Sequence, residues 1–387
     1  MSAASLLLCQ SQDAAPPGCG IIPAPKYPEG VHGGGIVLGL RQPVLGIIAT
    51  VIVIAVSLGL ISFFEFPTFA GWVSYGLMCL IPMQIVVGVT WGTNQPKFAA
   101  KQDQPLKGAL LLLTTAVVGA IVVPAYLAVP GGNVVPPSPM LMHATITSVV
   151  VTFWAAIIFG GWPFKAIIKN EVGAGLAMLA ACYVLNYLFF KVFFDYGFMQ
   201  GAPVYVASLD PHGMFGALNA LVFEVTFLIG LFMMAGFDLW PFTKFSGVMR
   251  QPVLGIVWTA VALAIGGLAF GVAVGIMKMD VMVFLVTVPV PYIFGSIVVL
   301  NMLQNSLFQK LAQPVKGIAN VIAVVVIGSA LAQMYRALSP TVSGTLHAGP
   351  PTYDLEIWTA SALLAVTFPF LIFFAEFFKF WPLTKTD

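Results

Sequence analysis

The chain has 387 residues, of which 59% are hydrophobic and only 8% are charged, and its formal net charge is +2. In a soluble domain about 25% of the residues are charged, so this chain has too few charges to cover a surface that faces water. The small net charge gives no reason to expect nucleic acid as a partner. The composition therefore predicts an integral membrane protein that contacts the lipid bilayer.

Apolar runs follow one another along the chain after residue 43. A helix needs about 20 apolar residues to cross roughly 30 Å of hydrocarbon, and runs this apolar cross lipid as helices. We expect ten transmembrane helices, at about 43–63, 70–92, 106–129, 143–161, 172–194, 216–239, 252–276, 281–303, 315–337 and 356–380. The predicted fold class is an all-α, polytopic membrane helix bundle with short loops.

Lysine and arginine are distributed unevenly over the two sides of this predicted bundle. Loops that follow even-numbered helices contain Lys97, Lys101, Lys165, Lys169, Lys244, Arg250 and Lys310, whereas the alternate loops contain Lys191, Lys278 and Arg336. Cytoplasmic loops are enriched in such residues. We expect both termini in the cytoplasm, in a bacterial inner membrane. Residues 1–40 form a Pro/Gly-rich cytoplasmic tail, and 41–387 form one transmembrane domain.

The stretch RQPVLGI occurs twice, at Arg41 and again at Arg250, at an offset of 209 residues. The same offset relates QPLKG at Gln104 to QPVKG at Gln313. The first four and the last four helices therefore form a parallel internal repeat, at 41–165 and 250–387, around a central hairpin at 166–249. A finer interpretation is one helical hairpin used five times, with KNEVGAG at Lys169 as the most divergent copy.

The repeated Gln-Pro-x-x-Gly motif has a structural interpretation. Proline suits the first turn of a helix, where its missing N–H would be unpaired anyway. The glutamine side chain can cap the free N–H groups of that turn. Glycine one turn later lets a neighbouring helix approach closely. The motif therefore predicts a device for starting helices rather than a binding site.

Polar residues inside a membrane are costly, and they are candidates for function. Glu224 is the only acid near the middle of a predicted helix, where it could carry a proton or bind a cation. The alternative is a protonated glutamate that is hydrogen-bonded to a neighbouring helix. Pro82 and Pro291 interrupt the runs 70–92 and 281–303 at the same place in the two halves, where kinks would free carbonyl groups.

Three histidines lie on the predicted outward side, before or at the start of even-numbered helices: His143, His212 and His347. Imidazole with thioether is a soft ligand set that suits copper or heme iron. The candidate metal ligands are these histidines together with Met142, Met214 and Asp210. The alternative is that the three loops never meet and that the histidines have separate surroundings.

The chain contains no nucleotide-binding motif, no HExxH motif and no CxxCH heme-attachment motif. Three functions remain open. The first is an integral membrane subunit of a redox or metal-dependent enzyme complex, with copper or heme and with other membrane or extracytoplasmic subunits as partners. The second is a secondary transporter or channel for a small solute or ion that uses Glu224 and the proline-kinked helices. The third is a non-catalytic scaffold subunit. Whether the protein is an enzyme stays open.

Overall fold

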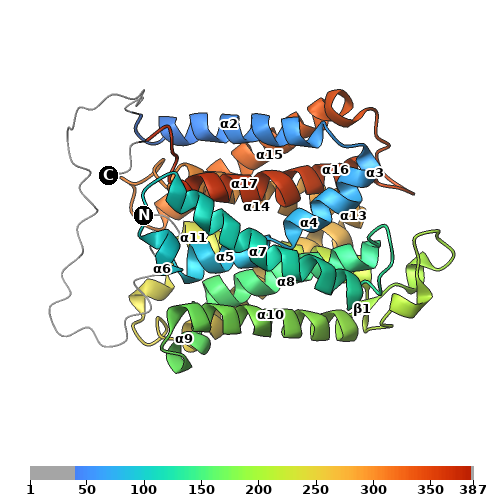
Figure 1. Ribbon diagram of the computed structural model, residues 1–387, viewed down its shortest axis with the longest axis horizontal. Helices are drawn as coiled ribbons and strands as arrows, with labels where there is room; N and C mark the ends of the chain where they lie inside the picture. Colours follow the sequence, from blue (N-terminus) through green and yellow to red (C-terminus); the bar gives the residue numbers. More distant parts are fainter. Residues whose placement is uncertain (1–39, 385–387) are drawn as a thin grey trace.

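A computed structural model describes residues 40–384 (Figure 1). The predicted cytoplasmic tail lies outside the described residues, apart from Leu40. Ten helices of the described chain are long and apolar enough to cross a membrane, and they match the ten predicted runs. The multi-pass helical bundle is therefore confirmed. Because ten spans return the chain to the side where it started, residues 40 and 384 lie at one end of the bundle, which we call the terminal end.

Odd- and even-numbered spans differ in how much of them is buried. In the odd-numbered spans 28–44% of the residues are buried, against 61–83% in the even-numbered spans. The odd-numbered, outer helices are α2 (Val44–Ile61), α7 (Leu106–Ala128), α10 (Glu171–Phe193), α12 (Val253–Phe270) and α15 (Val315–Ser343). The even-numbered, inner helices are α4 (Ser74–Met78) with α5 (Ile81–Ile85), α8 (Pro139–Phe153), α11 (Ala217–Gly236), α13 (Val281–Thr287) with α14 (Pro289–Ile297), and α16 (Asp354–Ala360) with α17 (Phe368–Ile372).

The inner helices contact one another in the order of the sequence. α5 packs on α8, α8 on α11, α11 on α14, and α14 on α17. The turn Ser361–Thr367 between α16 and α17 packs on α4, which closes the order into a ring. Each outer helix contacts at least two inner spans: α10, for example, lies against the α4–α5 span and α8, and α12 lies against α8 and α11.

The Gln-Pro-x-x-Gly motif starts four outer helices and ties each of them to the end of an inner helix. At the start of α7, Gln104 accepts a hydrogen bond from the backbone N–H of Gly108 (3.1 Å) and donates one to the carbonyl of Phe377 (2.6 Å). We call the hydrogen bond that the glutamine donates to the end of the inner helix a glutamine bridge. Gln251 likewise accepts a hydrogen bond from the backbone N–H of Gly255 (3.1 Å) and donates one to the carbonyl of Ile158 (2.9 Å). The predicted capping role is confirmed for Gln104, Gln251 and Gln313, whereas the Oε1 atom of Gln42 is buried without a hydrogen-bond partner.

The glycine of the motif is required by close packing. A Cβ atom on Gly108 would lie 2.6 Å from the ring of Phe378, and one on Gly255 would lie 2.5 Å from the ring of Phe159. In α10 the positions that correspond to the glutamine and the glycine of the motif are Glu171 and Gly175. There Glu171 accepts hydrogen bonds from Trp91 and Gln95 at the end of the α4–α5 span.

Four of the five inner spans end in a π-helical turn at the terminal end: Val86–Thr90, Trp154–Ile158, Val298–Met302 and Phe373–Phe377. The last residues of three of these turns provide the carbonyls for the bridges from Gln42, Gln251 and Gln104. α11 has no such turn, and Gln313 donates instead to the carboxylate of Asp238, at 2.9 Å. The end of α11 thus differs from the other four.

The prolines predicted to kink two inner spans do stand where those spans are interrupted. α5 starts one residue before Pro82, and α14 starts at Pro289 and contains Pro291. Trp91 and Leu303 are structurally equivalent, because the N–H of each closes the π-helical turn that ends its span. However, Pro82 precedes Trp91 by nine residues, whereas Pro291 precedes Leu303 by twelve. Three residues correspond to about 4.5 Å along a helix. The two prolines, matched by the sequence offset, therefore lie at different heights.

Candidate functional site

The first three turns of α8 present two polar side chains on one face, at the end of the bundle opposite the terminal end. Ser138 caps α8 by accepting a hydrogen bond from the N–H of Leu141 (3.3 Å), and Pro139 occupies the first helical position. His143 and Thr147 follow, four residues apart. Residues with this spacing lie one above the other on a helix. Local sequence therefore fixes their relative position.

His143 is held by Tyr196, which lies in the segment 194–216 between α10 and α11. The Nδ1 atom of His143 lies 3.0 Å from the hydroxyl of Tyr196, and the two rings stack with their centroids 5.4 Å apart. Burial raises the pKa of Tyr196 well above its ordinary value, and the negative charges of Glu224 and Asp210 add to this shift. Because the phenol keeps its proton, it can donate to Nδ1 when that nitrogen is unprotonated.

Thr147 connects the same face of α8 to α11. Its hydroxyl lies 2.8 Å from a carboxylate oxygen of Glu224 and 3.1 Å from the backbone carbonyl of His143. Glu224 is half-buried and stands between two neighbouring inner helices. Tyr196, His143, Thr147 and Glu224 therefore follow one another from the 194–216 segment into the span, and we call them the polar column.

Asp210 organises the segment that covers the polar column. Its Oδ1 atom accepts hydrogen bonds from the N–H groups of Tyr196 (3.1 Å) and His212 (3.0 Å), and its Oδ2 accepts one from the hydroxyl of Tyr205 (3.0 Å). Burial disfavours the charged carboxylate, but these three hydrogen bonds outweigh burial and hold the pKa of Asp210 below its ordinary value. The Asp210 carboxylate thus holds the backbone of Tyr196 in place within the 194–216 segment.

Three side chains of this segment come close enough to share a metal ion. A two-residue parallel strand pair, β1 (Phe194–Asp195) with β2 (Phe215–Gly216), closes the segment on itself. The Nδ1 atom of His212 lies 3.7 Å from Asp195 and 3.4 Å from Asp210, and the ligand atoms of all three residues lie within 4.8 Å of one another. Carboxylate and imidazole form a harder ligand set than the imidazole and thioether expected from the sequence.

The other predicted metal ligands have separate surroundings. The three-residue group contains Asp210 and His212, but neither His143 nor His347. Met214 precedes β2 and is 69% exposed, whereas Met142 is half-buried on α8 beside His143. The structure thus joins His143 to Glu224 through Thr147, and His212 to Asp210, while His347 lies in another segment.

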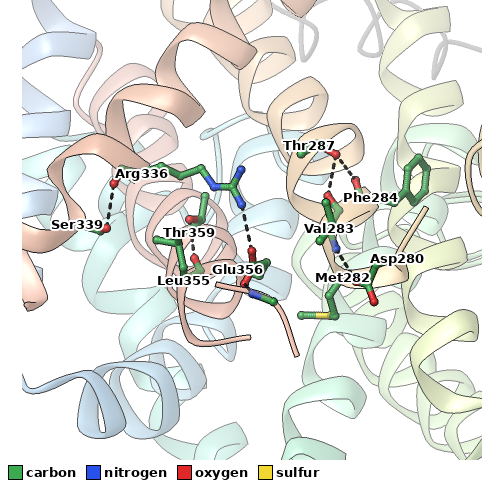
Figure 2. A network of polar contacts seen from close by, with 11 residues as sticks. Asp280, Met282, Val283, Phe284, Thr287, Arg336, Ser339, Leu355, Glu356 and Thr359 are labelled. Carbon is green, nitrogen blue, oxygen red and sulfur yellow. Dashed lines mark hydrogen bonds and ion pairs between the residues drawn. The ribbon is translucent and has the colours of Figure 1, made fainter. Parts of the chain in front are cut away.

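His347 belongs to the segment 344–353 between α15 and α16, which a closed polar network holds. Figure 2 shows Arg336 of α15 reaching Glu356 at the start of α16, at 3.2 Å. The second carboxylate oxygen of Glu356 accepts the N–H of Gly349 (3.0 Å). The backbone carbonyl of His347 accepts the N–H of Leu355 (3.0 Å). Both oxygens of Glu356 therefore have partners, and the network holds the chain in place.

Other polar residues within the spans join neighbouring helices. Gln84 of α5 donates to the carbonyl of Pro369 in α17 (2.7 Å), and Asn186 of α10 donates to the hydroxyl of Tyr126 in α7. These bonds cross helix contacts, as is common inside membrane bundles. Asn219 is exposed on α11. Within the described spans, Glu224 is distinguished from these residues by its position at the inner end of the polar column.

Sequence reasoning missed three members of the site: Thr147, Tyr196 and Asp195. The four-residue spacing of His143 and Thr147 was a usable signal, because it places both on one helix face. Asp195 and Tyr196 directly follow a long apolar run, but only the fold of the 194–216 segment brings them to α8. Comparison with protein-family models, curated proteins and solved structures finds no match to this chain.

Proposed function

We propose that the protein is a secondary transporter or channel that moves a proton or another small monovalent cation, and that Glu224 takes up this ion. The observation that supports this proposal most is the polar column, which leads from the 194–216 segment to Glu224. Each neighbouring pair in the column is joined by a hydrogen bond or lies on adjacent turns of α8. Ionisable side chains placed within membrane spans commonly mark ion pathways and proton relays.

The surroundings of Glu224 support uptake of an ion. Among the described residues no lysine or arginine pairs with Glu224, unlike Glu356 and Glu376. The carboxylate accepts one hydrogen bond, from Thr147. A carboxylate without a cationic side chain lowers its charge by binding a proton or a cation. This is the chemistry that uptake of an ion from the column needs.

The same proposal takes the chain as five copies of one helical hairpin. The recurring glutamine bridges, the glycine contacts and the ring of inner helices support this interpretation. Lysine and arginine are concentrated at the terminal end, which we assign to the cytoplasm, as in a bacterial inner membrane. The polar column then begins at the outward side.

The test is proton flux into vesicles. The purified protein is reconstituted in liposomes that contain a pH-sensitive dye, and a potassium gradient with valinomycin drives the flux. We expect Glu224→Gln to reduce the flux to the level of protein-free vesicles. The matched control is Glu65→Gln, which removes one acid at an exposed position before α3 (Phe66–Thr68). Equal flux in Glu224→Gln and the unchanged protein would refute the role of Glu224.

A second candidate function is a metal-dependent membrane subunit, which the group Asp195, Asp210 and His212 favours. The test is metal analysis and an optical spectrum of the protein purified in detergent. A stoichiometric metal that is lost in His212→Gln would support this candidate. A metal-free, colourless protein would argue against it, and also against the copper or heme expected from the sequence.

A further inference from the structure

Three phenylalanine side chains meet inside the ring of inner helices. Phe153 at the end of α8 packs against Phe232 of α11, with ring centroids 5.6 Å apart in an edge-to-face arrangement. Phe153 also packs against Phe368 of α17, with centroids 6.0 Å apart. All three are buried, with 4–5% of each residue exposed. We call them the phenylalanine cluster.

The contact between Phe153 and Phe368 crosses the inside of the ring. The ring neighbours of α8 are α5 and α11, whereas α17 neighbours α14 and the α4–α5 span. Because α8 and α17 are not neighbours in the ring, the contact between their side chains lies inside the ring. Aromatic rings fill such a centre with few side chains, because each is large and rigid.

The cluster lies beyond the inner end of the polar column. On α8, Phe153 follows Thr147 by six residues, which is about 9 Å along the helix. On α11, Phe232 follows Glu224 by eight residues, which is about 12 Å. Both helices run from the 194–216 end to the terminal end. Along the helix axes, the phenylalanine cluster thus lies between Glu224 and the terminal end.

We propose that Phe153, Phe232 and Phe368 form the gate of the ion pathway, a hydrophobic constriction across the ring that separates Glu224 from the terminal end. This inference rests on the proposed transport function. A constriction of this kind blocks ions by excluding the water that would hydrate them. Opening requires a change in the packing of α8, α11 and α17, the three helices that carry the cluster.

The experiment uses the same reconstituted vesicles and measures passive proton leak. We expect Phe153→Ala to raise the leak at least tenfold, because it removes the ring that contacts both other members. Phe153→Leu, which keeps most of the volume, should leak far less. The matched control is Phe189→Ala on α10, which breaks another edge-to-face pair, with Phe193, on an outer helix. Each variant is first checked for a monodisperse elution profile.

The outcomes separate the gate from the transport function. If Phe153→Ala elutes as a folded protein and leaks no more than Phe189→Ala, the gate is refuted, whatever Glu224→Gln does. If Phe153→Ala leaks and Glu224→Gln has no effect on driven flux, the gate stands and the role of Glu224 falls. Where Phe153→Ala does not fold, Phe232→Leu takes its place, with an increased leak expected and an unchanged leak refuting the gate.

Discussion

Two polar regions stand at the same end of the bundle, and they differ in how their acids are paired. In the α15–α16 region, both oxygens of Glu356 have partners, one of them the guanidinium of Arg336. In the α8–α11 region, Glu224 accepts a hydrogen bond from Thr147 and forms no ion pair among the described residues. The first arrangement is suited to hold a fold, and the second is suited to exchange an ion. Four tests probe this contrast.

The largest effect is expected where the paired region is broken. Glu356→Ala leaves the half-buried guanidinium of Arg336 and the N–H of Gly349 without their partner, and losing one partner of a largely buried ion pair costs about 3 kcal/mol. Thermal unfolding in detergent should show this loss. Glu224→Gln, measured in the same way, should unfold close to the unchanged protein. Equal destabilisation by the two variants would remove the contrast between the regions.

The next effect concerns the polar column. His143→Phe keeps a ring stacked on Tyr196 but removes the nitrogen that meets its hydroxyl. A positioned proton-transfer group contributes about 100-fold or more to rate, so driven proton flux should fall by about that factor. Tyr196→Phe removes the same hydrogen bond from the other side and should give a similar fall. Unchanged flux in both variants would exclude a relay through this pair.

A smaller effect is expected from matched threonines in the two regions. Thr147→Val removes the hydrogen bond to Glu224 and should lower proton flux about tenfold, which corresponds to about 1.4 kcal/mol. Thr359→Val is the control, because the hydroxyl of Thr359 donates only to the carbonyl of Leu355 on its own helix. A reduced flux in Thr359→Val would show that the assay responds to general loss of polar bonds.

The smallest effect is the response of the two covering segments to pH. The pKa of Asp210 is lowered in the folded state, so its stabilising bonds are present at neutral pH and are lost only in acid, as the pH falls through that lowered pKa. The hydrogen bond that Tyr353 donates to Asp280, together with burial, raises the pKa of Tyr353 to about 12. The contribution of this hydrogen bond to stability is present below about pH 10 and is lost as the pH rises toward 12.

Limited proteolysis measures this response. Cleavage within 194–216 should increase in acid, and cleavage within 344–353 should increase in alkali. Asp210→Asn should remove the acid response of the first segment, and Tyr353→Phe should remove the alkaline response of the second. If both segments open at the same pH in every variant, the assigned groups are not the ones that control them.

Local features of the sequence predicted local features of the structure. Apolar runs gave the ten spans, and the motif at Gln104 and Gln251 predicted helix starts, because both depend on residues close in the chain. Which spans lie inside could not be predicted. The outer spans have mean hydropathies of 1.8–2.9 and the inner spans 1.7–2.3, because lipid and protein interior are both apolar surroundings.

The site was predicted in part for the same reason. Glu224 was recognisable because acids are rare within spans. The bond between His143 and Tyr196 was not, because it joins residues 53 positions apart through a segment with little regular structure. The offset of 209 residues also matched Pro82 to Pro291, which the structure places at different heights. The sequence repeat thus identifies equivalent helix starts, whereas within a span the height of a residue also depends on the π-helical turns.

The glutamine bridges have a consequence for the order in which the protein can be assembled. Gln251 and Gln313 reach partners that precede them in the chain, Ile158 and Asp238, so α12 and α15 find their docking sites already synthesised. Gln42 and Gln104 reach Met302 and Phe377, which are 260 and 273 residues further on. The bridges of the first two outer helices can therefore form only after the eighth and tenth spans have been synthesised, although α7 can contact α4 and α5 earlier.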